Sequence, residues 1–262
     1  MKIAMDKYYT SDEVVDFCLN ELKKVLTEDG ITPSRVIEPS AGNGAFSRKI
    51  KNCIAYDIEP ECDGIIKADF LELNIPYLKN SVVIGNPPFG VKFNLGMKFF
   101  KHCINHSDYI AFILPIRQFN NTNRLYEFDL IKSFDLGMCD YSDRKLHCCF
   151  NIYKRPKNGL NKKDKKKLQC VEIVRCDSKR FENFDYDIRM CSWGNGSGGK
   201  LLKENETASG VYKIKIKDKF KDRVIKVLEQ TDWRKEINNI AMLSIPQYYI
   251  INVLKREIPE IY

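Results

Sequence analysis

The sequence predicts an α/β protein: a doubly wound, mostly parallel sheet followed by a smaller α+β region. Three observations support this class. Up to about residue 116, short apolar segments alternate with helical or loop segments, as in repeated strand–helix–strand units. Two further apolar segments, between residues 134 and 154, follow each other directly and predict an antiparallel hairpin at the sheet edge. Beyond residue 156 this alternation of strand and helix segments ends, and the balance of acidic and basic residues changes.

The first predicted element is an amphipathic helix that begins near residue 12. Thr10 and Glu13 have the T-x-x-E spacing of a capping box, and apolar side chains then recur at helical spacing. Asp29, Gly30 and Pro33 predict its end.

Five apolar segments then predict the parallel strands. In chain order they are RVIEP (35–39), CIAYDI (53–58), GIIKADF (64–70), SVVIG (81–85) and YIAFILP (109–115). GAFSRKI (44–50) predicts the start of one helix, and LGMKFFKHCIN (95–105) predicts another.

A turn-rich segment at 155–159 and a lysine-dense segment at 161–167 predict a boundary near residue 156. We therefore expect a catalytic domain at 1–156 and a basic target-recognition region at 157–262. In the second region, 168–174 and 211–218 predict strands, whereas 220–230 and 246–258 predict helices.

Charge is divided unevenly along the chain. Lys and Arg number 43 against 35 Asp and Glu, a formal net charge of +8. Residues 1–155 are balanced, so the whole excess lies in the second region. This asymmetry favours a polyanionic partner, nucleic acid first; the alternative is a solvated lysine-rich surface.

Composition excludes several other classes. Hydrophobic residues make up 44% of the 262, which excludes wholesale disorder. We expect no membrane span and no secretory signal, since no apolar run is long enough. Ten cysteines without a CxxC pair, beside three histidines, predict free thiols in a reducing intracellular compartment and no metal site. The sequence sets no oligomeric state.

The segment EPSAGNG (38–44) follows the first predicted strand. Its glycines permit a sharp turn and a close backbone approach to a ligand. The G-x-G-x-x-S spacing is only part of a dinucleotide fingerprint, so a tight turn without a ligand is the alternative. Nineteen residues after Glu38, Asp57 ends the second strand, where an acid can accept hydrogen bonds from ribose hydroxyls.

Two later strand ends carry further candidates. Asp69 could accept from an adenine amino group beside Phe70; alternatively Asp69 caps a helix and Phe70 belongs to the core. The decisive element is Asn86-Pro87-Pro88-Phe89, because two prolines force the chain out of the sheet on a stiff backbone. An Asn carbonyl and a backbone carbonyl can then face one amino group, with Phe89 stacked on the ring that bears it.

These motifs, in this order, resemble the S-adenosylmethionine-dependent N6-adenine DNA methyltransferases with gamma-type motif order. The resemblance covers roughly residues 7–155. It rests on KYYTSDEVVDF (7–17), IEPSAGNGAF (37–46), AYDIEP (55–60), ADFLEL (68–73), NPPF (86–89), YIAFILP (109–115) and CCFNIYKRP (148–156). Ser11 stands where the family's N-terminal motif usually has proline.

The resemblance implies a Rossmann-like methyltransferase sheet that binds S-adenosylmethionine. It places the cofactor among Tyr9, Thr10, Glu38, Ser40, Gly42, Asp57, Ile58, Asp69 and Phe70. It implies that Asn86 and the Pro87 carbonyl hold the target amine, that Pro88 completes the motif, and that Phe89 stacks on a base flipped out of the duplex.

For the second region we expect a contact loop from Asp187 to Lys200. Arg189 and Lys200 are candidate phosphate or base contacts. Trp193 is either a wedge or stacking residue or, slightly favoured, an anchor of the core. DNA is the favoured substrate; RNA, a protein glutamine amide and a silent nucleic-acid binder are the alternatives.

Overall fold

The computed structural model describes residues 10–141, 144–163, 168–176, 183–194, 197–208, 210–237 and 244–261. The chain forms two compact units, residues 1–163 and 164–262. Tyr9, expected at the cofactor site, lies outside the described residues.

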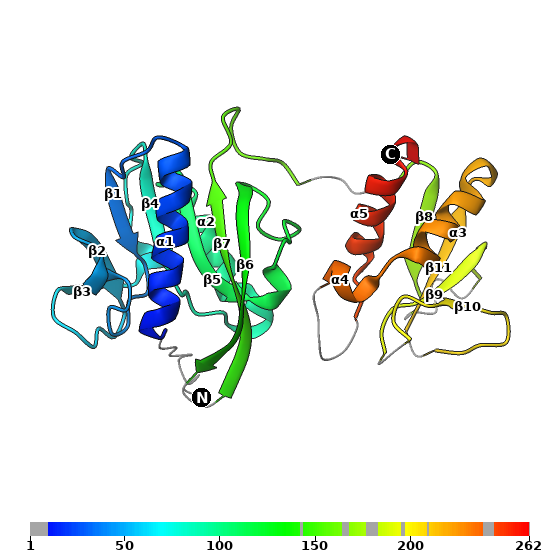
Figure 1. Ribbon diagram of the computed structural model, residues 1–262, viewed down its shortest axis with the longest axis horizontal. Helices are drawn as coiled ribbons and strands as arrows, with labels where there is room; N and C mark the ends of the chain where they lie inside the picture. The colour runs from blue at the N-terminus through cyan, green and yellow to red at the C-terminus, as the bar shows by residue number, and fades with distance from the viewer. Residues whose placement is uncertain are drawn as a thin grey trace. The chain divides into compact units, whose positions relative to one another are not determined.

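The first unit contains a seven-stranded sheet in the order β3-β2-β1-β4-β5-β7-β6 (Figure 1). Its strands are β1 Arg35–Glu38, β2 Cys53–Asp57, β3 Ile65–Lys67, β4 Ser81–Gly85, β5 Tyr109–Pro115, β6 Asp129–Tyr141 and β7 Arg144–Lys154. Strands β1 to β5 pair in parallel, and β7 lies antiparallel between β5 and β6. The expected Rossmann-like sheet with an antiparallel hairpin is therefore confirmed.

Strand order reverses between β1 and β4, which are neighbours in space. The connections after these two strands leave the sheet in opposite directions. In sheets of this kind the crevice outside the carboxyl ends of such strands is where ligands bind. The sequences that follow β1, β2 and β4 therefore meet at one edge.

Two helices flank this sheet, α1 Asp12–Glu28 in front and α2 Asn94–Cys103 behind in the view of Figure 1. The α1 helix begins at Asp12, as expected, but its N-cap is Ser11 and not Thr10: the Ser11 hydroxyl accepts from the Val14 amide at 3.5 Å. Gly30, at φ 68°, follows the last turn, as expected.

The helix expected at 44–50 is a single 3₁₀ turn, Ser47–Lys49. Strand β2 begins at Cys53, so the connection is too short for a longer helix. Three further 3₁₀ turns span Phe70–Glu72, Val91–Phe93 and Ile116–Gln118.

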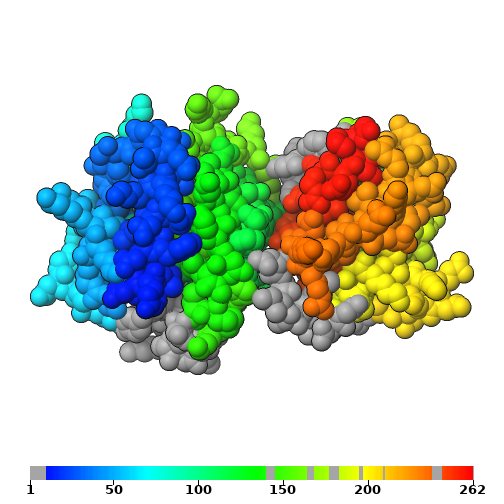
Figure 2. All heavy atoms as spheres, in the orientation of Figure 1, coloured from blue at the N-terminus to red at the C-terminus, as the bar shows by residue number. Residues whose placement is uncertain are grey.

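The second unit is a four-stranded sheet in the order β10-β9-β11-β8 with antiparallel pairing. Its elements are β8 Val171–Arg175, β9 Ile188–Cys191, β10 Leu201–Leu202, β11 Val211–Ile216, α3 Lys221–Gln230, α4 Trp233–Ile237 and α5 Gln247–Glu257, with 3₁₀ turns at Asp218–Phe220 and Pro259–Ile261. Alternate β11 side chains are buried, and they share one core with α3 and α5, which lie side by side (Figures 1 and 2). The smaller α+β unit is thus confirmed as a fold.

Candidate active site

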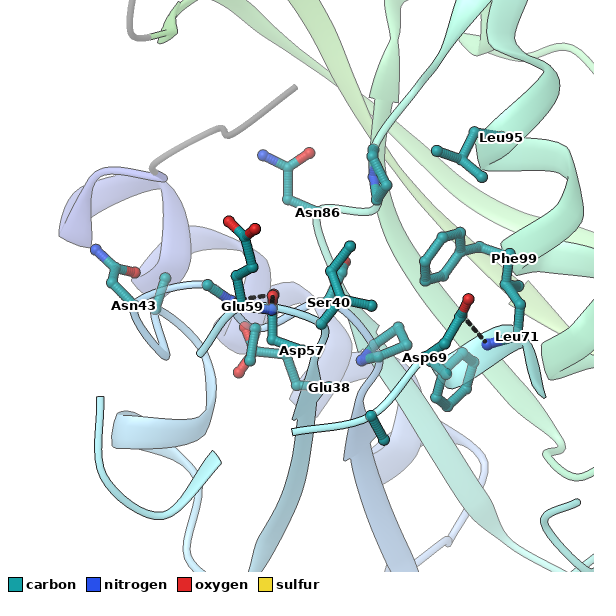
Figure 3. A pocket seen from close by; sticks show the side chains of 18 of the residues that line it. Glu38, Ser40, Asn43, Asp57, Glu59, Asp69, Leu71, Asn86, Leu95 and Phe99 are labelled. Atoms are coloured by element: carbon teal, nitrogen blue, oxygen red, sulfur yellow. Dashed lines mark hydrogen bonds between the residues drawn. The ribbon is translucent and has the colours of Figure 1, made fainter. Parts of the chain in front are cut away.

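A cavity of 420 Å³ lies in the first unit, where the segments that follow β1, β2, β3 and β4 come together. Ten of the residues singled out from the sequence line it: Thr10, Glu38, Ser40, Gly42, Asp57, Ile58, Asp69, Phe70, Asn86 and Pro88. They come from five separate parts of the chain. Figure 3 shows the side chains around this cavity.

The carboxylate of Asp57 holds the glycine loop against the end of β2. Its Oδ2 accepts from the Gly42 amide at 2.7 Å, and its Oδ1 accepts from the Glu59 amide at 2.8 Å. The Ala41 amide also donates to the Tyr56 carbonyl at 2.9 Å. Each carboxylate oxygen retains a second lone pair, so Asp57 can still accept from a ligand hydroxyl.

Gly42 has φ 52°, and a Cβ there would meet nothing within 4 Å. The turn therefore requires glycine for its backbone conformation and not for lack of space.

Glu38 is buried at the end of β1, only 2% exposed. Its Oε2 accepts from the Ser47 amide at 2.8 Å and its Oε1 from the Phe46 amide at 3.3 Å. Burial raises the pKa of this carboxyl, while these hydrogen bonds oppose that rise. Glu38 therefore fixes the far end of the glycine loop as well as lining the cavity.

Asp69 and Phe70 have the capping and core roles that were the alternatives, and both also line the cavity. Asp69 Oδ1 accepts from the Leu71 amide at 3.0 Å, so it caps the 3₁₀ turn, yet Asp69 also lines the cavity. The Phe70 ring is buried and lies parallel to that of Phe99, with 5.9 Å between centroids. Phe70 thus belongs to the core and forms part of the cavity wall.

Asn86 follows β4, every residue of which is buried. Gly85 fits tightly beside the first loop, because a Cβ there would lie 3.3 Å from Cδ of Pro39. The Asn86 Nδ2 donates to the Thr10 hydroxyl at 3.2 Å. Its Oδ1 is buried and has no partner among the described residues. A buried, unpaired amide carbonyl at a cavity wall is an acceptor prepared for a ligand donor.

The other NPPF residues divide between cavity and core. Pro88 lines the cavity, whereas Pro87 is buried and does not. Phe89 is 6% exposed and lies in the core, 6.4 Å from the Phe93 ring. The ring expected to stack on a base is therefore turned away from the cavity in this structure.

Several lining residues were not singled out from the sequence: Asn43, Glu59, Glu61, Val91, Leu95 and Phe99. Leu95 and Phe99 are four residues apart on α2, so they share a helix face. In Figure 3 they lie on the side of the cavity away from Asp57 and Glu59. Their spacing directly after NPPF is the signal that could have identified this apolar wall.

The cavity is acidic. Five carboxyl-bearing residues line it, namely Glu38, Asp57, Glu59, Glu61 and Asp69. The part of the chain that the structure describes supplies it with no Lys, Arg or His. Such a lining favours a ligand with positive charge and disfavours phosphate groups.

Of the three candidates in the second unit, Trp193 and Lys200 line one cavity of 400 Å³, which Arg189 does not line. Arg189 lies in β9, not in a loop, and its Nη2 donates to the carbonyl of Lys203 and to that of Glu204 at 2.8 Å. Lys200 forms an ion pair with Glu206 at 2.6 Å.

Trp193 is 38% exposed and does not belong to the core of this unit, whereas Trp233 is 5% exposed and does. The interpretation of Trp193 as a core anchor is therefore wrong.

Within the described residues, no three His, Cys, Asp or Glu side chains are grouped as a metal site. All ten cysteines have free thiols. No described helix has the length and apolar character needed to cross a membrane.

No protein-family model and no curated protein matches the sequence. Solved structures similar to this chain include Thermoplasma acidophilum 1320, at 19% identity and TM-score 0.44, covering 60% of this chain and 93% of that one. A putative RNA methyltransferase from Pyrococcus horikoshii has 17% identity and TM-score 0.45, covering 59% and 89%. The 23S rRNA methyltransferase ErmE has 13% identity and TM-score 0.44, covering 60% and 72%.

Proposed function

We propose that this chain transfers a methyl group from S-adenosylmethionine to the N6 amino group of adenine in DNA. The observation that carries the proposal is the Asn86 amide, which lines the cavity: its Nδ2 is bound to Thr10, while its Oδ1 is buried and has no partner in the part of the chain that the structure describes.

The residues present fit S-adenosylmethionine. Asp57, held by two backbone amides, is oriented to accept from ribose hydroxyls. Asp69 retains a free oxygen for the adenine amino group, beside the apolar wall of Leu95 and Phe99. Ser40 adds a buried hydroxyl oxygen that lacks a partner among the described residues.

Charge discriminates between nucleotide cofactors. S-adenosylmethionine carries a positive sulfonium and an ammonium group, whereas NAD and ATP carry phosphates. A lining with five carboxyl-bearing residues and no described cation suits the former. When bound, S-adenosylmethionine supplies an electrophilic methyl group, so the protein has mainly to align the acceptor nitrogen with it.

The hydrogen-bond acceptors of the NPPF motif suit a planar amine. The Asn86 carbonyl would accept one N–H, and a backbone carbonyl of the same motif would accept the other. Both hydrogens would then lie in the ring plane, and the nitrogen lone pair would be directed toward the methyl group. Such fixed acceptors need no reorganisation during the reaction.

Adenine in DNA is put first because the order of the motifs resembles that of DNA N6-adenine methyltransferases, and the whole excess of positive charge lies between residues 156 and 262, which suits a nucleic acid. RNA is the second candidate, since the same amine and the same charge argument apply. A glutamine amide is the third, and the basic second unit argues against it. A nucleic-acid substrate also implies an intracellular location.

Radiolabelled S-adenosylmethionine tests this assignment. Purified full-length protein is offered duplex DNA, single-stranded DNA, total RNA and a protein extract, followed by nucleoside digestion and mass spectrometry. We expect N6-methyldeoxyadenosine in DNA. Label in RNA or protein alone would overturn the substrate assignment, and no label anywhere would overturn the activity. Sequencing of the modified DNA then gives the methylated position.

A further inference from the structure

The loop that follows NPPF projects one apolar side chain at the rim of the cavity. Val91 is 80% exposed, more than any other exposed large apolar residue that the structure describes. It nevertheless lines the cavity, together with Asn86 and Pro88. Lys92 beside it is also exposed.

The exposed tip of this loop, Val91 and Lys92, is flanked by residues that are packed in the core. Phe89 and Phe93, on either side of it, are both buried at 6% exposure. The amides of Leu95 and Gly96 donate to the Phe89 carbonyl at 3.2 and 3.3 Å. A Cβ on Gly96 would lie 2.2 Å from the Phe93 ring, so that ring packs directly on the α2 backbone.

The backbone of the loop has unusual torsion angles. Lys92 and Phe93 have φ of 53° and 65°, the left-handed region that side chains other than glycine rarely adopt. Gly90 has φ 65°, and a Cβ there would lie 2.7 Å from Leu95 Cβ. Such conformations persist only where the surroundings enforce them, and they concentrate at functional sites.

Arg124 supplies part of that enforcement from a distant part of the chain. Its Nη1 donates to the Lys92 carbonyl at 2.6 Å, and its Nη2 donates to Asn94 Oδ1 at 3.1 Å. Its guanidinium also lies 5.7 Å from the centre of the Phe93 ring. The tip is therefore held outward and cannot fold back over the cavity without breaking these contacts.

We propose that Val91 is the side chain that enters the duplex and occupies the space left by the flipped adenine, with Lys92 beside it for the adjacent phosphate. This inference rests on the proposed function. An apolar side chain on a rigid support can separate stacked bases, as apolar wedges do in other DNA-bending proteins. Its place next to Asn86 puts the wedge beside the site that receives the base.

The test uses duplexes built on the position that the wild-type protein methylates, with the target adenine opposite either thymine or an abasic site. An abasic partner removes the base pair that has to be broken before the adenine can leave the duplex. We expect Val91→Ser to lower kcat/KM about tenfold on the paired duplex and less than about threefold on the abasic duplex. Val91→Leu, which keeps an apolar side chain, should lose less kcat/KM than Val91→Ser on the paired duplex. Met138→Ser, at an exposed apolar residue outside the cavity, is the matched control.

A second measurement does not depend on methyl transfer. With 2-aminopurine at the target position, wild-type binding should raise fluorescence as the base leaves the stack, and Val91→Ser should reduce this rise on the paired duplex only. Equal losses on both duplexes would overturn the role of Val91, as would a weaker cofactor Kd that accounts for the loss. Absence of N6-methyladenine with the wild-type protein would instead overturn the proposed function, and the wedge with it.

Discussion

Asn86 donates its side-chain Nδ2 to the Thr10 hydroxyl over 3.2 Å, across 76 positions of sequence. In this arrangement the amide nitrogen faces Thr10 and the amide oxygen faces the cavity side. With the nitrogen held, the oxygen remains as a buried acceptor without a partner among the described residues. The segment before α1 therefore orients the residue that we propose holds the target amine.

Thr10→Val should remove the hydrogen bond that orients the Asn86 amide, while it preserves the shape of the residue 10 side chain. We expect kcat to fall about threefold to tenfold, the value of one hydrogen bond of roughly 1 kcal/mol. Thr10→Ser should retain the rate, because it keeps the hydroxyl. If Thr10 instead binds the cofactor carboxylate alone, calorimetry would show a weakened cofactor Kd while kcat stays unchanged.

Asp57→Ala should weaken cofactor binding about tenfold or more, the effect of losing charge-assisted hydrogen bonds. Asp57→Asn, which keeps one acceptor oxygen, should have an intermediate effect. Isothermal titration calorimetry measures both. Because Asp57 also anchors the Gly42 amide, thermal unfolding without cofactor serves as the control for folding. An unchanged dissociation constant in Asp57→Ala would remove this residue from the site.

His106 should make the first unit sensitive to mild acid. Burial lowers its pKa from 6.5 to about 4, with smaller contributions from His102, Arg35 and Arg155. Below about pH 6.5 the unfolded chain binds a proton that the folded chain does not, so stability falls as the pH drops from about 6.5 to 4. The loss should reach at most about 3 kcal/mol.

Urea unfolding at pH 7.5 and 4.5 measures this loss, and His106→Gln should reduce the difference between the two pH values. The variant is expected to be less stable than the wild type at pH 7.5. The quantity to compare is therefore the change in the free energy of unfolding between the two pH values, and not the free energy at either pH. An identical pH dependence in the two proteins would contradict this account.

The sequence was most informative at strand ends. Strands β1, β2 and β4 are short apolar segments, each closed by a recognisable polar or proline motif, so the meeting of Glu38, Asp57 and Asn86 followed from parallel topology. The fold class could be predicted for the same reason.

Features that depend on tertiary packing could not be predicted. Nothing in the local pattern indicates that Phe89 turns into the core, or that Phe70 stacks on Phe99. Strands β9 and β10 have four and two residues, too few for a periodicity, so Arg189 was expected in a loop.

The most direct test of the central claim is a paired measurement on Asn86→Ala. The account predicts that methyl transfer falls at least about a hundredfold, as when one fixed transition-state hydrogen bond is removed. The Kd for S-adenosylmethionine, measured by calorimetry on the same preparation, should change less than about twofold, because we propose that Asn86 holds the methyl acceptor. Wild-type transfer rates in Asn86→Ala would contradict the account.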